Sequence, residues 1–284
     1  MANLTGLDDI VNVLRGNTSG SKPQNIFAFI DPFINNTGTA ATGPIAARVT
    51  SLWNYNGNPS NNNTIPTTTV VYPTNITTGS LGQQNAISAS GELWLMGVTC
   101  NCLSQGTLLV YDRLAYMGGL SATVTTTQIV SESALTRYTG SMSVGNQIWV
   151  EIYTAIGGTS AFVMANYKNQ NGVISTTPSA SIGNTGLKEG QRMIQLPLAS
   201  GDTGVTEVMS VNVSPSTVIA GNFGITIVRP LCWVPINIFG SVRDMVMDLP
   251  SITKIEANAC IATAVLCVTT TAIQLMASFN IIEK

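Results

Sequence analysis

The chain has 284 residues, of which 12 are Lys or Arg and 14 are Asp or Glu, so its formal net charge is −2. Charged residues make up 9% of it and apolar residues 44%, whereas about a quarter of a typical soluble domain is charged. This balance excludes a disordered chain, and the absence of Lys/Arg runs argues against direct contact with nucleic acid. We expect a surface of uncharged polar residues, which suits a subunit that becomes covered by its neighbours.

The chain contains no histidine. This excludes a Ser-His-Asp triad and every metal site that uses an imidazole ligand. The sequence also has no G-x-G-x-x-G loop and no Walker lysine, so no nucleotide site is indicated. We therefore expect no catalytic residues, no cofactor and no metal.

The first predicted element is a short helix over residues 5–14, with Thr5 as its cap and Asp8 completing a capping box. Its apolar stripe follows i, i+3, i+4, i+7 spacing and consists of Leu7, Ile10, Val11 and Leu14. A helix this short is marginal alone, so we predict that this stripe makes an intersubunit contact. The first residues also lack the basic and apolar regions of a secretory signal.

Residues 16–45 are rich in Gly, Asn, Ser, Thr and Pro and show little periodicity. A connection of this length is uncommon inside a compact domain. Two interpretations remain open: a surface loop, or an extended arm that reaches a neighbouring subunit. We therefore divide the chain into a helix and arm (1–45) and a β-domain (46–284).

After residue 91, apolar segments rich in β-branched residues alternate with Gly, Thr and Asn turns. They are predicted to pair as four hairpins, namely 93–99 with 107–113, 148–155 with 160–167, 207–214 with 223–229, and 262–268 with 272–282. Strict alternation is clear in 148–153, which predicts one face in a core and the other toward solvent or a neighbour. The pattern predicts an all-β, antiparallel β-sandwich or jelly-roll-like fold, built as one sandwich, two sub-sheets or a tandem.

Two further segments near the C-terminus require a choice. Residues 241–249 are predicted to form a second short helix, capped by Ser241 and ended by Pro250. Residues 259–282 are uncharged and long enough to span a bilayer. From Thr271 onward they alternate with strand periodicity, so we expect strands and no membrane partner.

Several residue groups could carry chemistry. Asp202-Thr203-Gly204 matches the tripeptide of aspartic proteases, which need two carboxylates sharing a proton, but it is also ordinary turn chemistry. Asp112 and Arg113 are expected to be structural. The five cysteines have irregular spacing and are predicted to be reduced and buried; they are Cys100, Cys102, Cys232, Cys260 and Cys267.

The aromatic residues could either form a sugar-stacking surface or lie in a core or subunit interface. They are Trp53, Trp94, Trp149, Trp233, Tyr55, Tyr72, Tyr116 and Tyr153. Most of them sit in apolar strand contexts, which favours the core or interface.

Five segments together resemble a family of bacteriophage virion structural proteins, of capsid or capsid-decoration type, over roughly residues 45–284. They are LWNYNGNP (52–59), TLLVYDRLAYMGGL (107–120), ALTRYT (134–139), QRMIQLPL (191–198) and AGNFGITIVRPL (220–231). The resemblance implies a virion component, assembled in the host cytoplasm, whose partners are copies of itself and other virion proteins. It carries over no active-site residue. The alternative within this reading is a tail or fibre module that binds host-surface glycans.

Overall fold

The computed structural model describes residues 12, 22–31, 43–60, 62, 64–82, 92–102, 104–130, 134–236, 243–246, 253–270 and 274–283. The elements in these residues are β-strands and one 3-10 helix, η1, Gly140–Ser143. All strand pairings are antiparallel, which confirms the predicted all-β class. The predicted N-terminal helix lies outside the described residues apart from Asn12, so the structure does not test it.

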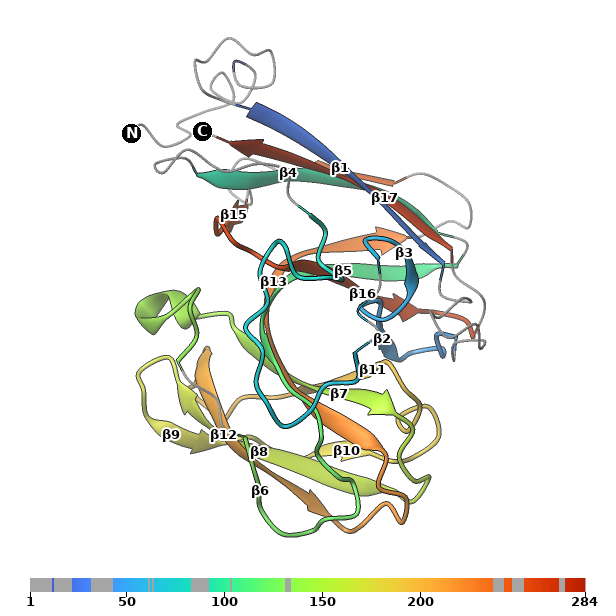
Figure 1. The fold of residues 1–284 in the computed structure, drawn as a ribbon, viewed down its shortest axis with the longest axis vertical. Helices are drawn as coiled ribbons and strands as arrows, with labels where there is room; N and C mark the ends of the chain where they lie inside the picture. Colours follow the sequence, from blue (N-terminus) through green and yellow to red (C-terminus); the bar gives the residue numbers. More distant parts are fainter. Residues whose placement is uncertain are drawn as a thin grey trace.

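The strands form two sheets and a closed barrel, stacked with the barrel in the middle (Figure 1). The six-stranded upper sheet has the order β14-β4-β17-β1-β3, with β15 also paired to β4. Its strands are β1 (Lys22–Asp31), β3 (Asn56–Asn58), β4 (Leu93–Cys102), β14 (Arg243–Val246), β15 (Thr253–Ile255) and β17 (Leu275–Glu283).

The barrel closes in the order β11-β2-β16-β5-β13-β7. Its strands are β2 (Val49–Ser51), β5 (Gly106–Tyr116), β7 (Gln147–Thr154), β11 (Arg192–Leu196), β13 (Asn222–Ile236) and β16 (Ile261–Cys267). The five-stranded lower sheet has the order β10-β8-β12-β6, with β9 also paired to β8. It consists of β6 (Gln128–Ile129), β8 (Ala161–Asn169), β9 (Ile174–Thr176), β10 (Ala180–Ile182) and β12 (Val205–Ser214).

Three apolar cores follow from this stacking. One lies between the upper sheet and the barrel, a second between the barrel and the lower sheet, and a third inside the barrel. Strand β7 contributes to two of these cores. Ile148, Val150 and Ile152 pack toward the lower sheet, while Trp149 points into the barrel. The predicted alternation is therefore confirmed, but the second face of this strand is buried in the barrel and does not face solvent.

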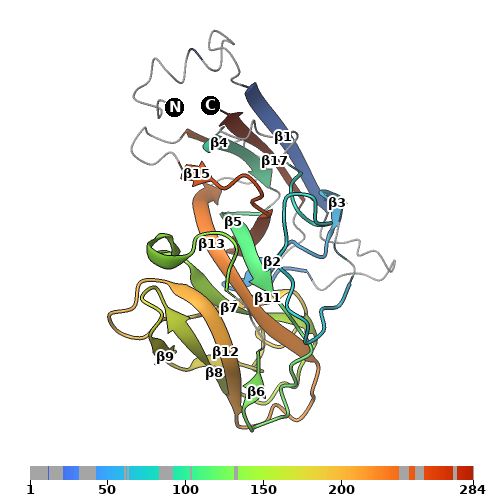
Figure 2. The same ribbon diagram turned by 60° about the vertical axis from the view of Figure 1, so that its left-hand side comes forward.

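All eight strands of the predicted hairpins are present, but none of the four hairpins forms. Each pair joins a barrel strand to a strand of a different layer: β4 with β5, β7 with β8, β12 with β13, and β16 with β17. Figure 2, turned by 60° from Figure 1, shows β13 as part of the barrel wall and β12 in the lower sheet. The two strands of each pair instead face each other across an apolar core, which buries side chains of both without hydrogen bonds between them.

Two other expectations are corrected. Residues 22–31, placed in the loop or arm, form β1, which pairs with β17 along most of its length and with β3 at its end. Residues 243–246, expected within a helix, form β14, which pairs with β4; pairing to an existing strand outweighs local helix propensity. The uncharged segment 259–282 contains β16 and β17, as its periodicity predicted.

The strands at the ends of both sheets are short. They are β14 and β3 in the upper sheet, with four and three residues, and β10 and β6 in the lower sheet, with three and two. Short edge strands limit pairing with other chains. Within the described residues, no helix is long and apolar enough to cross a membrane.

Candidate functional site

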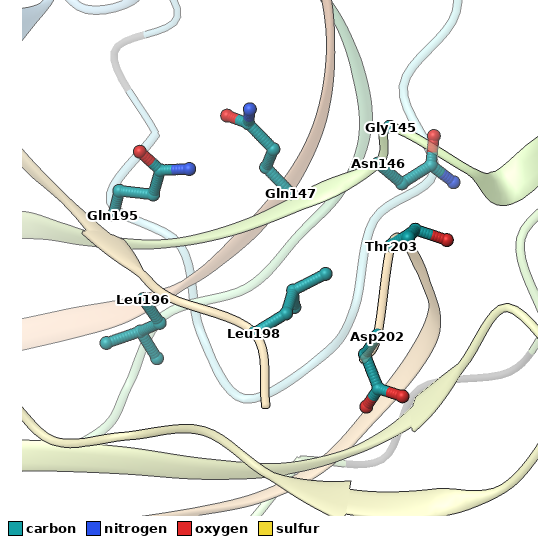
Figure 3. Close-up of a pocket in the computed structure, with 8 residues that line it drawn as sticks. All are labelled: Gly145, Asn146, Gln147, Gln195, Leu196, Leu198, Asp202 and Thr203. Carbon is teal, nitrogen blue, oxygen red and sulfur yellow. The ribbon is translucent and has the colours of Figure 1, made fainter. Parts of the chain in front are cut away.

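The Asp202-Thr203-Gly204 tripeptide lies beside a cleft of about 260 Å³ (Figure 3). Figure 3 shows the Asp202 carboxylate turned away from Gln147. It accepts hydrogen bonds from the Tyr167 hydroxyl at 2.6 Å and from the Asn169 amide at 2.7 Å. The bond from Tyr167, followed by bonds from Ser175 and Asn169, lowers the pKa of Asp202.

These contacts make Asp202 the anchor of a turn. The Tyr167 hydroxyl that donates to Asp202 also accepts a hydrogen bond from the Ala199 backbone at 2.8 Å, so the carboxylate holds the 199–203 turn against β8. Among the residues that line the cleft, Asp202 is the one carboxylate. The proton-sharing pair of an aspartic protease is therefore not assembled in this cleft.

Asp112 and Arg113 are adjacent on β5 but belong to different ion pairs. Asp112 is held by two hydrogen bonds from Arg137, at 2.9 and 2.7 Å, and by one from the Cys260 backbone at 2.8 Å. Arg113 is paired with Glu151 of β7 inside the barrel, and both side chains are fully buried. Successive residues of a strand point to opposite faces, which explains why the two neighbours serve different clusters.

The Arg113–Glu151 pair is surrounded by further polar and aromatic groups. Glu151 also accepts hydrogen bonds from Thr226 at 2.8 Å and from Tyr153 at 3.1 Å. The Arg113 guanidinium lies 4.6 and 4.4 Å from the ring centroids of Trp53 and Tyr116. Sequence reasoning missed Glu151 as the partner of Arg113, because 38 residues separate them and only closure of the barrel brings them together.

The pKa values in this pair reflect burial opposed by charge. Burial alone raises the pKa of Glu151, but the charge and hydrogen bonds of Arg113 outweigh it, so the pKa lies below its usual value. Burial lowers the pKa of Arg113, but Glu151, Tyr153 and Tyr111 together raise it above its usual value. Both groups are therefore held ionised, as a structural ion pair.

The candidate aromatics are mostly internal. Trp53 and Trp149 lie in the core of the barrel together with Tyr116. The other buried members are Tyr55 and Tyr153. Trp94 and Tyr72 are partly buried, and Trp233 is 40% exposed. The predicted core location is thus confirmed for five of the eight, and these residues do not form one exposed sugar-stacking surface.

All five cysteines lie in the described residues as buried, reduced thiols, as predicted. Within those residues, no group of three or more His, Cys, Asp or Glu side chains is placed to hold a metal ion. The predicted contact residues Leu7, Ile10, Val11 and Leu14 lie outside the part of the chain that the structure describes.

The lower sheet carries exposed apolar side chains on the face opposite to the barrel. We call this the outer face and define it by Ile129, Phe162, Met164 and Ile174, which are 66%, 48%, 37% and 61% exposed. The strand register places small polar residues between them: Met164 is opposite Asn212, Phe162 opposite Ser214, and Ile129 opposite Ser210. On the other side of β8, Val163, Ala165 and Tyr167 are buried.

The charged residues that the strand register places on this face are Lys168 of β8 and Glu207 of β12. They lie opposite each other and form an ion pair at 2.6 Å. The outer face is therefore apolar and uncharged-polar, with its two charges mutually neutralised. We take this face as our candidate functional site.

The sequence matches no protein-family model and no curated protein. Among solved structures, the chain is similar to the VP2 subviral particle of infectious bursal disease virus, with 9% identity over 92% of this chain and 80% of that one, at a TM-score of 0.22. Infectious bursal disease virus Gt strain follows with 9% identity, 96% and 86% coverage and a TM-score of 0.21. Arabinosyltransferase EmbB from Mycobacterium smegmatis has 12% identity, 46% and 13% coverage and a TM-score of 0.23. TM-scores this low establish neither a shared fold nor a shared function.

Proposed function

We propose that this protein is a structural subunit of a bacteriophage particle, in the capsid shell or in its decoration, and that it acts by self-assembly and without catalysis. The observation that carries the proposal is the outer face. This one sheet face exposes four large apolar side chains and no unpaired charge, which suits a contact surface.

The occupant that we propose for this face is a second copy of the chain. In a two-fold contact, the same surface meets itself, so unpaired charges of one sign would oppose each other. The outer face avoids this conflict, because its residues are uncharged apart from the paired Lys168 and Glu207. The low charged fraction of the whole chain, 9%, suits a protein whose surface is covered in a particle.

Sedimentation velocity at rising protein concentration tests this proposal. We expect the wild-type protein to self-associate, and the double variant Phe162→Ser/Met164→Ser to require at least tenfold higher concentration. The matched control is Ile76→Ser, because Ile76 is 89% exposed on a loop outside the outer face. A wild type that stays monomeric, or a double variant that associates like the control, would contradict the proposal.

The position in the particle is tested separately. Quantitative mass spectrometry of purified virions gives the number of copies per particle. We expect hundreds of copies for a shell or decoration subunit. A dozen or fewer copies would instead assign the protein to the tail, a fibre or the portal.

A further inference from the structure

The two cysteines of the C-x-C pair face the barrel together. Cys100 and Cys102 are separated by one residue on β4 and are each 1% exposed, so both point to the same, inner face of the upper sheet. They lie in the apolar core between the upper sheet and the barrel. Two barrel cysteines, Cys232 on β13 and Cys267 on β16, lie in the same core.

The surroundings of Cys102 and Cys267 bring these two residues next to each other. The turn after β4 is joined to the turn after β16, because the Ser104 hydroxyl lies 3.2 Å from that of Thr269 and the Val268 backbone donates to Gln105 at 3.0 Å. Cys102 precedes Ser104 by two residues, and Cys267 precedes Thr269 by two. The two cysteines therefore occupy matching positions on adjoining strand ends.

The electrostatics of Cys267 also place Cys102 near it. Besides burial, Cys102 raises the pKa of Cys267 and the Ser104 side chain lowers it, so both groups lie close to the Cys267 thiol. Disulfides between packed β-layers are geometrically feasible, as in immunoglobulin domains.

We propose that Cys102 and Cys267 form a site of oxidative cross-linking, in which a disulfide covalently joins the upper sheet to the barrel. The oxidant is a small-molecule disulfide such as oxidised glutathione. One protein thiolate attacks it to form a mixed disulfide and releases one glutathione thiolate. The second cysteine then attacks the protein sulfur, forms the Cys102–Cys267 bond and releases the second glutathione. The protein loses two electrons and two protons, and oxidised glutathione becomes two reduced molecules.

Burial decides when this bond can form. Burial raises the pKa of Cys267 to about 12 and also raises that of Cys102, so thiolates are rare at neutral pH in the folded protein. The attacking species is the thiolate. Oxidation is therefore slow in the closed fold and accelerates with rising pH. Once formed, the bond is shielded from reductants by the same burial.

The experiment treats the full-length protein with oxidised glutathione at pH 8.5, followed by alkylation and mass-spectrometric peptide mapping. A Cys100→Ala background is used, because Cys100 and Cys102 fall in one tryptic peptide. We expect a peptide cross-linked through Cys102 and Cys267, and a melting temperature higher by roughly 10 °C than that of the reduced protein, because the bond closes a loop of well over a hundred residues.

The controls separate this pair from the other thiols. Adding Cys267→Ala should remove the cross-link, whereas adding Cys260→Ala should leave it, since Cys260 lies in the barrel core and not between the layers. Circular dichroism checks that each variant folds. If a variant does not fold, the wild-type protein is oxidised and cut with a protease that cleaves between residues 100 and 102, so that the cysteine linked to Cys267 can be identified. Recovery of Cys102 and Cys267 as alkylated thiols after oxidation, or linkage of either to another cysteine, would overturn the proposal.

Discussion

At the scale of single residues, the distinctive feature is the buried charge inside the barrel. Removing Arg113 and Glu151 from water is costly, and their mutual attraction offsets that cost only with good geometry and additional hydrogen bonds. The barrel supplies both, through Thr226 and Tyr153 on the carboxylate and through aromatic rings on the guanidinium. Breaking such a pair is therefore far more damaging than breaking a surface pair.

We expect Glu151→Gln to lower the free energy of unfolding by about 3–5 kcal/mol at pH 7, because it leaves Arg113 charged and unpaired in the barrel. The matched control is Glu207→Gln, which breaks the partly exposed pair with Lys168. It should cost no more than about 1 kcal/mol. Urea unfolding followed by tryptophan fluorescence measures both. Equal losses of unfolding free energy in the two variants would show that the barrel pair contributes no more to stability than a surface pair.

The same pair predicts a dependence on pH. The pKa of Glu151 in the folded protein lies below its usual value, so the stability that it contributes is present above that usual value and is lost as pH falls. In acid, the wild-type carboxylate becomes neutral, like the glutamine of the variant. We therefore expect the difference in unfolding free energy between wild type and Glu151→Gln to shrink progressively as pH falls below 4.5, the usual pKa of a glutamate carboxyl. A difference that stays constant over this range would contradict the assignment.

At the scale of elements, another segment of the chain approaches the backbone of strand β13 very closely. Its residue Gly224 lies against the carbonyl oxygen of Met117, where an added Cβ would come within 1.7 Å. Met117 also donates its backbone N–H to Ile225 at 3.0 Å, so the contact is part of the strand pairing. Any side chain at this position has to push the 117–118 segment off the barrel.

Gly224→Ala should therefore destabilise the protein by roughly 1–3 kcal/mol through overpacking. Gly82→Ala is the control, since an added Cβ at Gly82 meets nothing within 4 Å. That change should alter stability by no more than about 0.5 kcal/mol. Differential scanning calorimetry distinguishes the two. An equally small effect at Gly224 would mean that the segment moves aside freely.

At the scale of the whole molecule, the described strands begin only after the first 21 residues. The first of these strands, β1, begins at Lys22. The predicted helix of residues 5–14 therefore includes none of the described strands. The proposed role of that helix in contacts between subunits can therefore be tested without removing any of the described strands.

Deletion of residues 1–20 should leave a soluble protein with an unchanged β-type circular dichroism spectrum, but one that no longer joins particles. The variant Leu7→Ser/Ile10→Ser/Leu14→Ser in the full-length chain should have the same effect, because it removes the predicted apolar stripe. Incorporation is measured as copies per purified particle. Full incorporation of either variant would show that the stripe is dispensable, and unfolding of the deletion variant would assign it to the protein's own core.

The sequence by itself determined the β class, the positions of the eight strands in the predicted hairpins, the burial of the cysteines and the internal location of most of the candidate aromatics. These follow from local periodicity and composition, as in 148–153, where the period of two is visible without any partner. Only the tertiary structure decided which strands pair, because a strand's apolar pattern is the same whichever layer it joins. For that reason β7 and β8 were predicted as a hairpin although they belong to different layers. The same limit applies to the sites: the Arg113–Glu151 pair, the outer face and the Cys102–Cys267 pair each join residues that are distant in sequence, and only the closure and stacking of the layers brings them together.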